Sequence, residues 1–170
     1  MSNPSAAFLL RTSFLALALS AGLFASGGQA HAQSRGHYVD AGTYLIEDDT
    51  RYEAWYHMRR QLVHNFDDIC GDTFCEGDYT NIQSLRYTCS VQRSSGRIGS
   101  CGWAFAASDD AVVALTGRIE SQPAAWLCIS PIVRGTTIEA FLDALQGDEP
   151  LYAALPVSGR TLYDGLVDCL

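Results

Sequence analysis

Six cysteines are the residues of this chain with the clearest chemical potential, and all of them follow an N-terminal segment typical of exported proteins. Thiols that reach an oxidising compartment pair as disulfides, whereas cytosolic thiols stay reduced and serve as nucleophiles or metal ligands. The sequence therefore predicts disulfides in place of reactive thiols. The cysteines concerned are Cys70, Cys75, Cys89, Cys101, Cys128 and Cys169.

Six cysteines allow fifteen sets of pairs, and the expected strand register favours one pair, whereas the other two pairs follow from short spacing and from what remains and stay open. The two cysteines of one pair close a short loop after the first predicted helix. Those of a second pair face each other across a predicted hairpin, and the third pair would tether the C-terminal tail. These pairs are Cys70–Cys75, Cys89–Cys101 and Cys128–Cys169. Zinc is the alternative for Cys70 and Cys75, with His64 nearby, but the sequence has no second close Cys/His pair to complete a four-ligand site.

An acidic string, from Asp67 to Asp78, spans the end of the first predicted helix and the loop after it. It contains five carboxylates and two glycines, and carboxylate oxygens are the ligands that calcium prefers. The spacing differs from that of an EF-hand loop, in which oxygen ligands stand at alternate positions. Two interpretations therefore stay open, a solvated acidic loop and a calcium-binding structural module at residues 67–78.

Two histidines and an arginine lie on one flank of the first predicted helix. His57 and His64 are two helical turns apart, and Arg60 lies between them. An imidazole can act as a general base, so a small hydrolase with a site between sheet and helices stays open, with His57 or His64 as its base. No Gly-x-Ser-x-Gly, P-loop or His-Glu-x-x-His motif is present, so no catalytic, metal-binding or cofactor-binding residue is assigned.

The N-terminal segment has the features of a secretory signal peptide. Arg11 is its only charged residue, an apolar run covers residues 14–25, and Ala30-His31-Ala32 fits the small-x-small pattern of a cleavage site. The run is too short to cross a bilayer as a helix. We expect a signal peptide at residues 1–32, cleavage after Ala32, and a periplasmic or secreted mature chain without a stable membrane span.

The expected mature chain is strongly acidic and contains no lysine. Without Arg11 it carries ten arginines and nineteen carboxylates, a formal net charge of −9. Nucleic acids and anionic membrane surfaces require compensating cations, so neither is an expected partner. The absence of lysine excludes Schiff-base chemistry and a lysine general base.

Three helices are predicted in the mature chain. Apolar residues recur at intervals of three and four over residues 50–69, and Thr50 and Glu53 have the spacing of a capping box at the start of this helix. The same signals predict a second helix at residues 136–147 and a short third one at residues 161–169.

Strict alternation of apolar and polar residues predicts a hairpin between the first and second helices. Ser94-Ser95-Gly96 separates two alternating segments, and glycine at the end of a three-residue turn accepts the positive φ that this turn requires. Centring the turn on Ser95 puts every cross-strand pair on one face. The predicted pairs are Val91–Gly99, Cys89–Cys101, Tyr87–Trp103 and Leu85–Phe105.

Two further turns are predicted, at Asp109-Asp110 and Gln122-Pro123, with strands at residues 113–119 and 126–133. Because Pro131 has no N–H, the last strand is expected at a sheet edge. The order predicts an α+β fold, with an N-terminal helix, a four-stranded antiparallel meander and C-terminal helices packed on one face. Residues 33–170 are expected to form a single disulfide-stapled domain.

The expected function follows from this combination of features. A compact, acidic, disulfide-stabilised domain without a catalytic motif is typical of a non-enzymatic binding protein, of inhibitor or immunity type, in the cell envelope or extracellular space. Its partner would be another envelope or secreted protein, and Trp126, Tyr152 and Tyr163 are candidates for the binding surface. The calcium module at residues 67–78 and the small hydrolase are the alternatives.

Overall fold

The computed structural model of the protein describes residues 37–77 and 79–170. The expected signal peptide, residues 1–32, and Asp78 of the acidic string lie outside the described residues. The elements are β1 (Tyr38–Asp40), α1 (Ala41–Leu45), α2 (Asp49–Ile69), a π-helical turn (Cys70–Phe74), β2 (Gln83–Gln92), β3 (Ile98–Val112), β4 (Ile119–Ile129), α3 (Ile138–Ala144) and α4 (Leu162–Val167). Among the described residues, no helix combines the length and the hydropathy that a membrane crossing requires.

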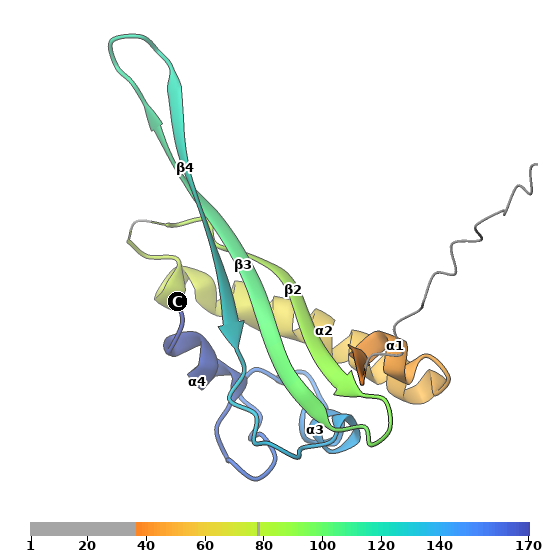
Figure 1. Ribbon diagram of the computed structural model, residues 1–170. Coiled ribbons are helices and arrows are strands. Elements are labelled where there is room, and N and C mark those ends of the chain that lie inside the picture. The colour runs from red at the N-terminus through yellow and green to blue at the C-terminus, as the bar shows by residue number, and fades with distance from the viewer. Residues whose placement is uncertain (1–36, 78) are drawn as a thin grey trace, which may run out of the picture. The chain divides into compact units, whose positions relative to one another are not determined.

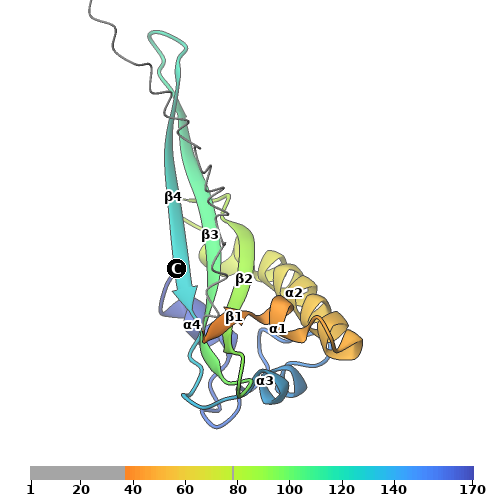
Figure 2. The same cartoon turned by 45° about the vertical axis from the view of Figure 1, so that its right-hand side comes forward.

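The four strands form one antiparallel sheet in the order β1-β2-β3-β4, which confirms the predicted α+β fold. The helices α2 and α3 lie on the same side of this sheet (Figures 1 and 2). That side is the inner face, where the core lies. The short elements β1 and α1 were not predicted from the sequence, because three and five residues are too few to show a periodic pattern.

The helix α2 is the first predicted helix, and its apolar stripe is buried against the inner face of the sheet. The four side chains of the stripe are each at most 3% exposed: Trp55, Met58, Leu62 and Phe66. The predicted capping box of Thr50 and Glu53 is wrong. Asp48 caps the helix instead, and its carboxylate accepts a hydrogen bond from the N–H of Arg51 at 3.1 Å.

The β2–β3 hairpin has the predicted register at its centre, where Cys89 faces Cys101 and Tyr87 faces Trp103. Both ends differ from the prediction, because the register shifts near Gly99 and again near Leu85. Val91 therefore does not face Gly99. Phe105 faces Ser84, and Leu85 is the extra residue of a bulge, which leaves its side chain 59% exposed.

The strands β3 and β4 are longer than predicted. The predicted turns at Asp109-Asp110 and Gln122-Pro123 are wrong, because the two strands run through both segments and pair there. The predicted strand at residues 113–119 is wrong as well, because residues 113–118 form the turn that joins β3 to β4. Ser108 faces Pro123, and the Ser108 N–H bonds the side chain of Asn81, on the side away from β4. The Ser108–Pro123 pair is therefore one whose backbone polar groups point out of the hairpin, so Pro123 removes no ladder hydrogen bond.

The C-terminal helices begin at threonine caps, close to the predicted positions. Thr137 caps α3, and Thr161 forms a capping box with Asp164 at the start of α4. A disulfide between Cys128 and Cys169 then joins the end of the chain to β4. This link holds α4 against the inner face of the sheet, where Leu162 and Leu166 are each 2% exposed.

All six cysteines are in disulfides, and the pairs are those that the sequence favours: Cys70–Cys75, Cys89–Cys101 and Cys128–Cys169. Their Cα atoms are 4.9, 4.0 and 5.5 Å apart, respectively. The Cys70–Cys75 bond leaves no thiolate there for zinc.

Candidate functional site

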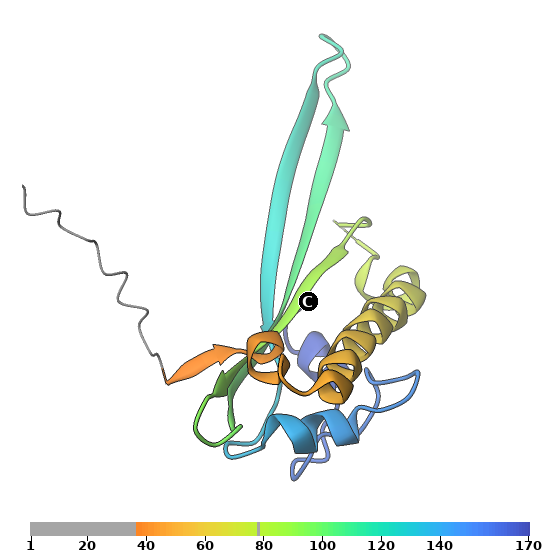
Figure 3. The same ribbon diagram turned by 90° about the vertical axis from the view of Figure 1, so that its right-hand side faces the viewer.

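The β3–β4 hairpin extends well beyond the rest of the sheet. β2 pairs with β3 only as far as Ala106, whereas β3 and β4 continue to pair up to Val112 and Ile119. Residues 107–124 thus form a two-stranded ribbon with a turn at its end. Figures 1 and 3 show this ribbon reaching away from the helices.

The end of the ribbon is apolar and exposed. Val112 faces Ile119 across the last rung, and each is 70% exposed. Leu115, in the turn, is 97% exposed. The turn is closed by a hydrogen bond from the Val113 N–H to the Arg118 carbonyl at 2.8 Å. The ordered turn therefore holds three apolar side chains in solvent, which is typical of a contact surface.

Aromatic packing fixes the base of the ribbon to the body. Trp126 faces Phe105, which is fully buried, and lies edge-on to Tyr79 with ring centroids 5.4 Å apart. Asn81 accepts a hydrogen bond from the Ser108 N–H at 3.0 Å and donates one to the Ser108 Oγ at 3.2 Å. The predicted partner-surface residue Trp126 is thus half-buried and serves to position the ribbon.

The other two predicted surface aromatics pack against each other, away from the ribbon. The ring centroids of Tyr152 and Tyr163 are 5.5 Å apart, and Tyr163 lies 5.9 Å from Phe74. Burial, followed by the charges of Tyr163, Glu149 and Asp68, raises the pKa of Tyr152 above its ordinary value. The structure does not bring these two tyrosines together with Trp126 into one surface.

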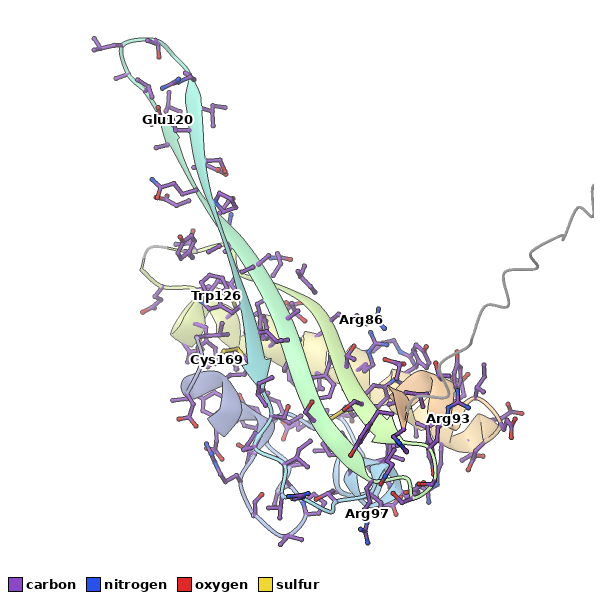
Figure 4. All side chains as sticks on the ribbon, viewed as in Figure 1. Arg86, Arg93, Arg97, Glu120, Trp126 and Cys169 are labelled. Atoms are coloured by element: carbon purple, nitrogen blue, oxygen red, sulfur yellow. A yellow bond between two sulfur atoms is a disulfide. The ribbon has the colours of Figure 1, made fainter. Side chains whose placement is uncertain are left out.

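The ribbon carries more acidic than basic side chains, with Asp109, Asp110 and Glu120 against Arg118. Two segments contain no arginine: residues 61–85, from α2 to the start of β2, and residues 98–117, which cover β3 and most of the turn of the ribbon. The described carboxylates of these segments are Asp67, Asp68, Asp72, Glu76, Asp109 and Asp110. Figure 4 shows Arg93 and Arg97 near the β2–β3 turn and Glu120 far from them, near the end of the ribbon.

A groove of about 420 Å³ lies between α2 and α3. Met58, Leu142 and Leu145 line it from the core, and Glu53, His57 and Arg60 are the charged or titratable groups that line it. The predicted base His57 therefore borders a concavity. Among the described residues, His57 has no hydrogen bond to a hydroxyl or carboxylate that would orient it as a base.

The second predicted base, His64, is elsewhere. Its side chain is 68% exposed, and its Nδ1 lies 3.7 Å from the Asp68 carboxylate, one helical turn away. The groove residues do not include it. The structure thus separates His57 and His64 and leaves the hydrolase alternative with a single imidazole at an open groove.

The described carboxylates of the acidic string do not gather around one point. Within residues 37–77 and 79–170, no group of three or more His, Cys, Asp or Glu side chains is arranged to hold a metal ion. Asp78, the last carboxylate of the string, lies outside these ranges. The described carboxylates of residues 67–77 are exposed and face solvent.

Sequence reasoning missed the ribbon because Asp109-Asp110 and Gln122-Pro123 have the composition of turns. The signal that could have found it is Thr116-Gly117, since Gly117 has a φ of 69° and stands between Val112 and Ile119. Comparison with known proteins found no matching family model, no similar curated protein and no similar solved structure. A function for this protein is therefore inferred from the surface of the chain.

Proposed function

We propose that this protein is an exported, non-enzymatic binding protein of inhibitor or immunity type, which holds a protein partner with the end of its β3–β4 ribbon. The observation that carries the proposal is the cluster of Val112, Leu115 and Ile119, which is 70–97% exposed on a ribbon that extends beyond the domain core.

Physical reasoning favours a contact role for this cluster. Isolated two-stranded hairpins are marginally stable, so a long ribbon with an exposed apolar end adds little to the stability of the domain. Burial of each such side chain in a partner would contribute about 1.5–3 kcal/mol. A narrow ribbon can also enter a cleft, which is what an inhibitor needs in order to block one.

The compartment is part of the proposal. Three disulfides suit the oxidising conditions of the periplasm or the extracellular space, and residues 1–32 have the sequence pattern of a signal peptide. The net charge of −8 favours a basic protein as the partner. The calcium and hydrolase alternatives have no structural observation of comparable weight.

The test compares two variants with three serine substitutions each. The ribbon variant carries Val112→Ser, Leu115→Ser and Ile119→Ser. The matched control changes three exposed apolar residues elsewhere on the domain, which are 57–63% exposed: Ile46→Ser, Leu85→Ser and Val167→Ser. For both variants, the free energy of unfolding in urea should differ from that of the wild type by less than about 0.5 kcal/mol per substitution, because exposed side chains add little to stability.

Partner recovery from the exported fraction of the source cells is then measured by affinity purification and quantitative mass spectrometry. The wild type and the control should retain one stoichiometric partner, and the ribbon variant should lose it. Three lost contacts correspond to at least about 4 kcal/mol, or more than a hundredfold in affinity. Equal recovery of the partner by the ribbon variant would refute the proposed function.

A further inference from the structure

One edge of β3 is open where the ribbon leaves the sheet. The last pair between β2 and β3 is Gln83–Ala106, and in this register the next pair that would exchange backbone hydrogen bonds is Asn81–Ser108. Asn81 is outside β2, and its side-chain amide takes the place of a backbone group by bonding the Ser108 N–H. The ladder on this side of β3 therefore ends at Ser108.

The backbone groups beyond Ser108 point to the same open side. N–H and C=O directions alternate along a strand, and the β3–β4 register is regular from Ser108 to Val112. The N–H groups of Asp110 and Val112 therefore point away from β4, as that of Ser108 does. In the described part of the chain, no strand pairs with them, and Tyr79, which a longer β2 would place there, packs on Trp126.

The opposite edge of the ribbon is partly blocked. Pro123 stands in the Ser108–Pro123 pair, so the N–H that it lacks would have pointed outward from β4. A strand added along β4 would meet this missing donor. The edge of β3 has no proline from Ser108 to Val112, and beyond the Ser108 N–H, which Asn81 occupies, the N–H groups of Asp110 and Val112 point outward.

Charge indicates what kind of strand the open edge accepts. Asp109 and Asp110 are exposed there, and Arg118, the arginine of residues 107–124, already pairs with Glu120. Two copies of this chain that paired antiparallel through this edge would bring their aspartates together, which is unfavourable. A strand that carries lysine or arginine would meet opposite charge along the same backbone.

We infer that the β3 edge from Ser108 to Val112 binds an extended, positively charged segment of a protein partner as an added strand. The inference rests on the proposed function, because it gives the apolar end of the ribbon a second contact with the same partner. Backbone hydrogen bonds would set the register of the added strand, and Asp109 and Asp110 would select its charge.

The probe for the test is a peptide of about eight residues in which lysine and valine alternate. A lysine–proline peptide of the same length and charge, Lys-Lys-Pro-Pro repeated twice, turns prolines without an N–H toward the edge in either orientation, and a glutamate–valine peptide has the opposite charge. Titration calorimetry on the full chain should show binding of the lysine–valine peptide, at least tenfold weaker binding of the lysine–proline peptide, and no binding of the glutamate–valine peptide. Amide exchange at Asp110 and Val112 should slow when the first peptide binds.

Proline substitutions separate the edge from the charge. Asp110→Pro removes an outward N–H without breaking the β3–β4 ladder, for the same reason that Pro123 does not break it. Asp110→Asn removes the charge alone. Ser121→Pro is the matched control, because Ser121 faces Asp110 and its N–H points outward from the other edge. Because Asp110→Pro loses one backbone hydrogen bond, its affinity for the lysine–valine peptide should be about fivefold lower than that of Asp110→Asn.

Ser121→Pro should bind the peptide as the wild type does, and circular dichroism should show that both proline variants keep their sheet. Equal binding of the lysine–proline and lysine–valine peptides, or equal binding by Asp110→Pro and Asp110→Asn, would overturn the inference. If Asp110→Pro keeps both the peptide and the natural partner while the serine variant of the ribbon end loses the partner, the proposed function stands and the edge inference fails. The reverse pattern would refute the proposed function and leave the edge inference intact.

Discussion

Removal of the Cys128–Cys169 disulfide should destabilise the protein more than removal of the Cys70–Cys75 disulfide. The two bonds join residues 41 and 5 positions apart, respectively. On the chain-entropy model, closing the longer loop contributes about 4 kcal/mol and closing the shorter one about 2 kcal/mol. Because the free energy of unfolding of single domains is about 5–15 kcal/mol, the longer link accounts for a large share of it.

The position of the longer link should also localise its effect. Cys169 follows α4, and the bond ties it to Cys128, which is 2% exposed in β4. Without the bond, α4 keeps the burial of Leu162 and Leu166 and the packing of Tyr163, but loses its covalent link to the sheet. We therefore expect faster amide exchange in α4 while α2 stays protected.

The assay is urea unfolding of two double variants, Cys128→Ala with Cys169→Ala, and Cys70→Ala with Cys75→Ala. The first should lower the free energy of unfolding by about 2 kcal/mol more than the second. Hydrogen exchange on the same samples locates the change. A loss in the first variant no larger than that in the second, or uniform exchange across both helices, would refute the reasoning that the longer loop holds the tail.

Two further predictions concern the core and one turn. The hydroxyl of Tyr87 is buried and 2.9 Å from Ser130 Oγ, and burial raises its pKa far above the ordinary value of 10.0. Only the unfolded state then loses this proton, so the free energy of unfolding should fall above pH 10 by about 1.4 kcal/mol per pH unit for this group. In urea unfolding between pH 9 and 11, Tyr87→Phe should reduce the dependence of the free energy of unfolding on pH. An unchanged dependence would contradict the raised pKa of Tyr87. Val157 has a φ of 69° and is 87% exposed, a conformation that asparagine tolerates better than a β-branched residue. Val157→Asn should raise the free energy of unfolding by about 0.5–1 kcal/mol, whereas Val157→Ile should not, and equal stability of the two variants would count against the strain.

Local patterns in the sequence determined much of this fold. The spacing of apolar residues located α2 and its buried face, because a helix repeats over a few residues and needs no distant information. Alternation on both sides of Ser95 predicted Cys89 opposite Cys101, because the apolar residues of paired strands must share the buried face, and a bulge near Gly99 brings the strands into that register. The disulfides followed from that register and from the loop lengths that remained.

Contacts between distant segments decided the rest, including the candidate site. Asn65 is 7% exposed because its side chain bonds the backbone of Asp148 and Leu151, more than eighty positions away. From its local sequence alone, Pro123 would be assigned to a turn. It belongs to a strand because its missing N–H points away from β3, which depends on its pairing with Ser108. The length of the ribbon and its open edge depend on where β2 stops, and Asn81 sets that point through a bond to Ser108 that the sequence around either residue does not encode.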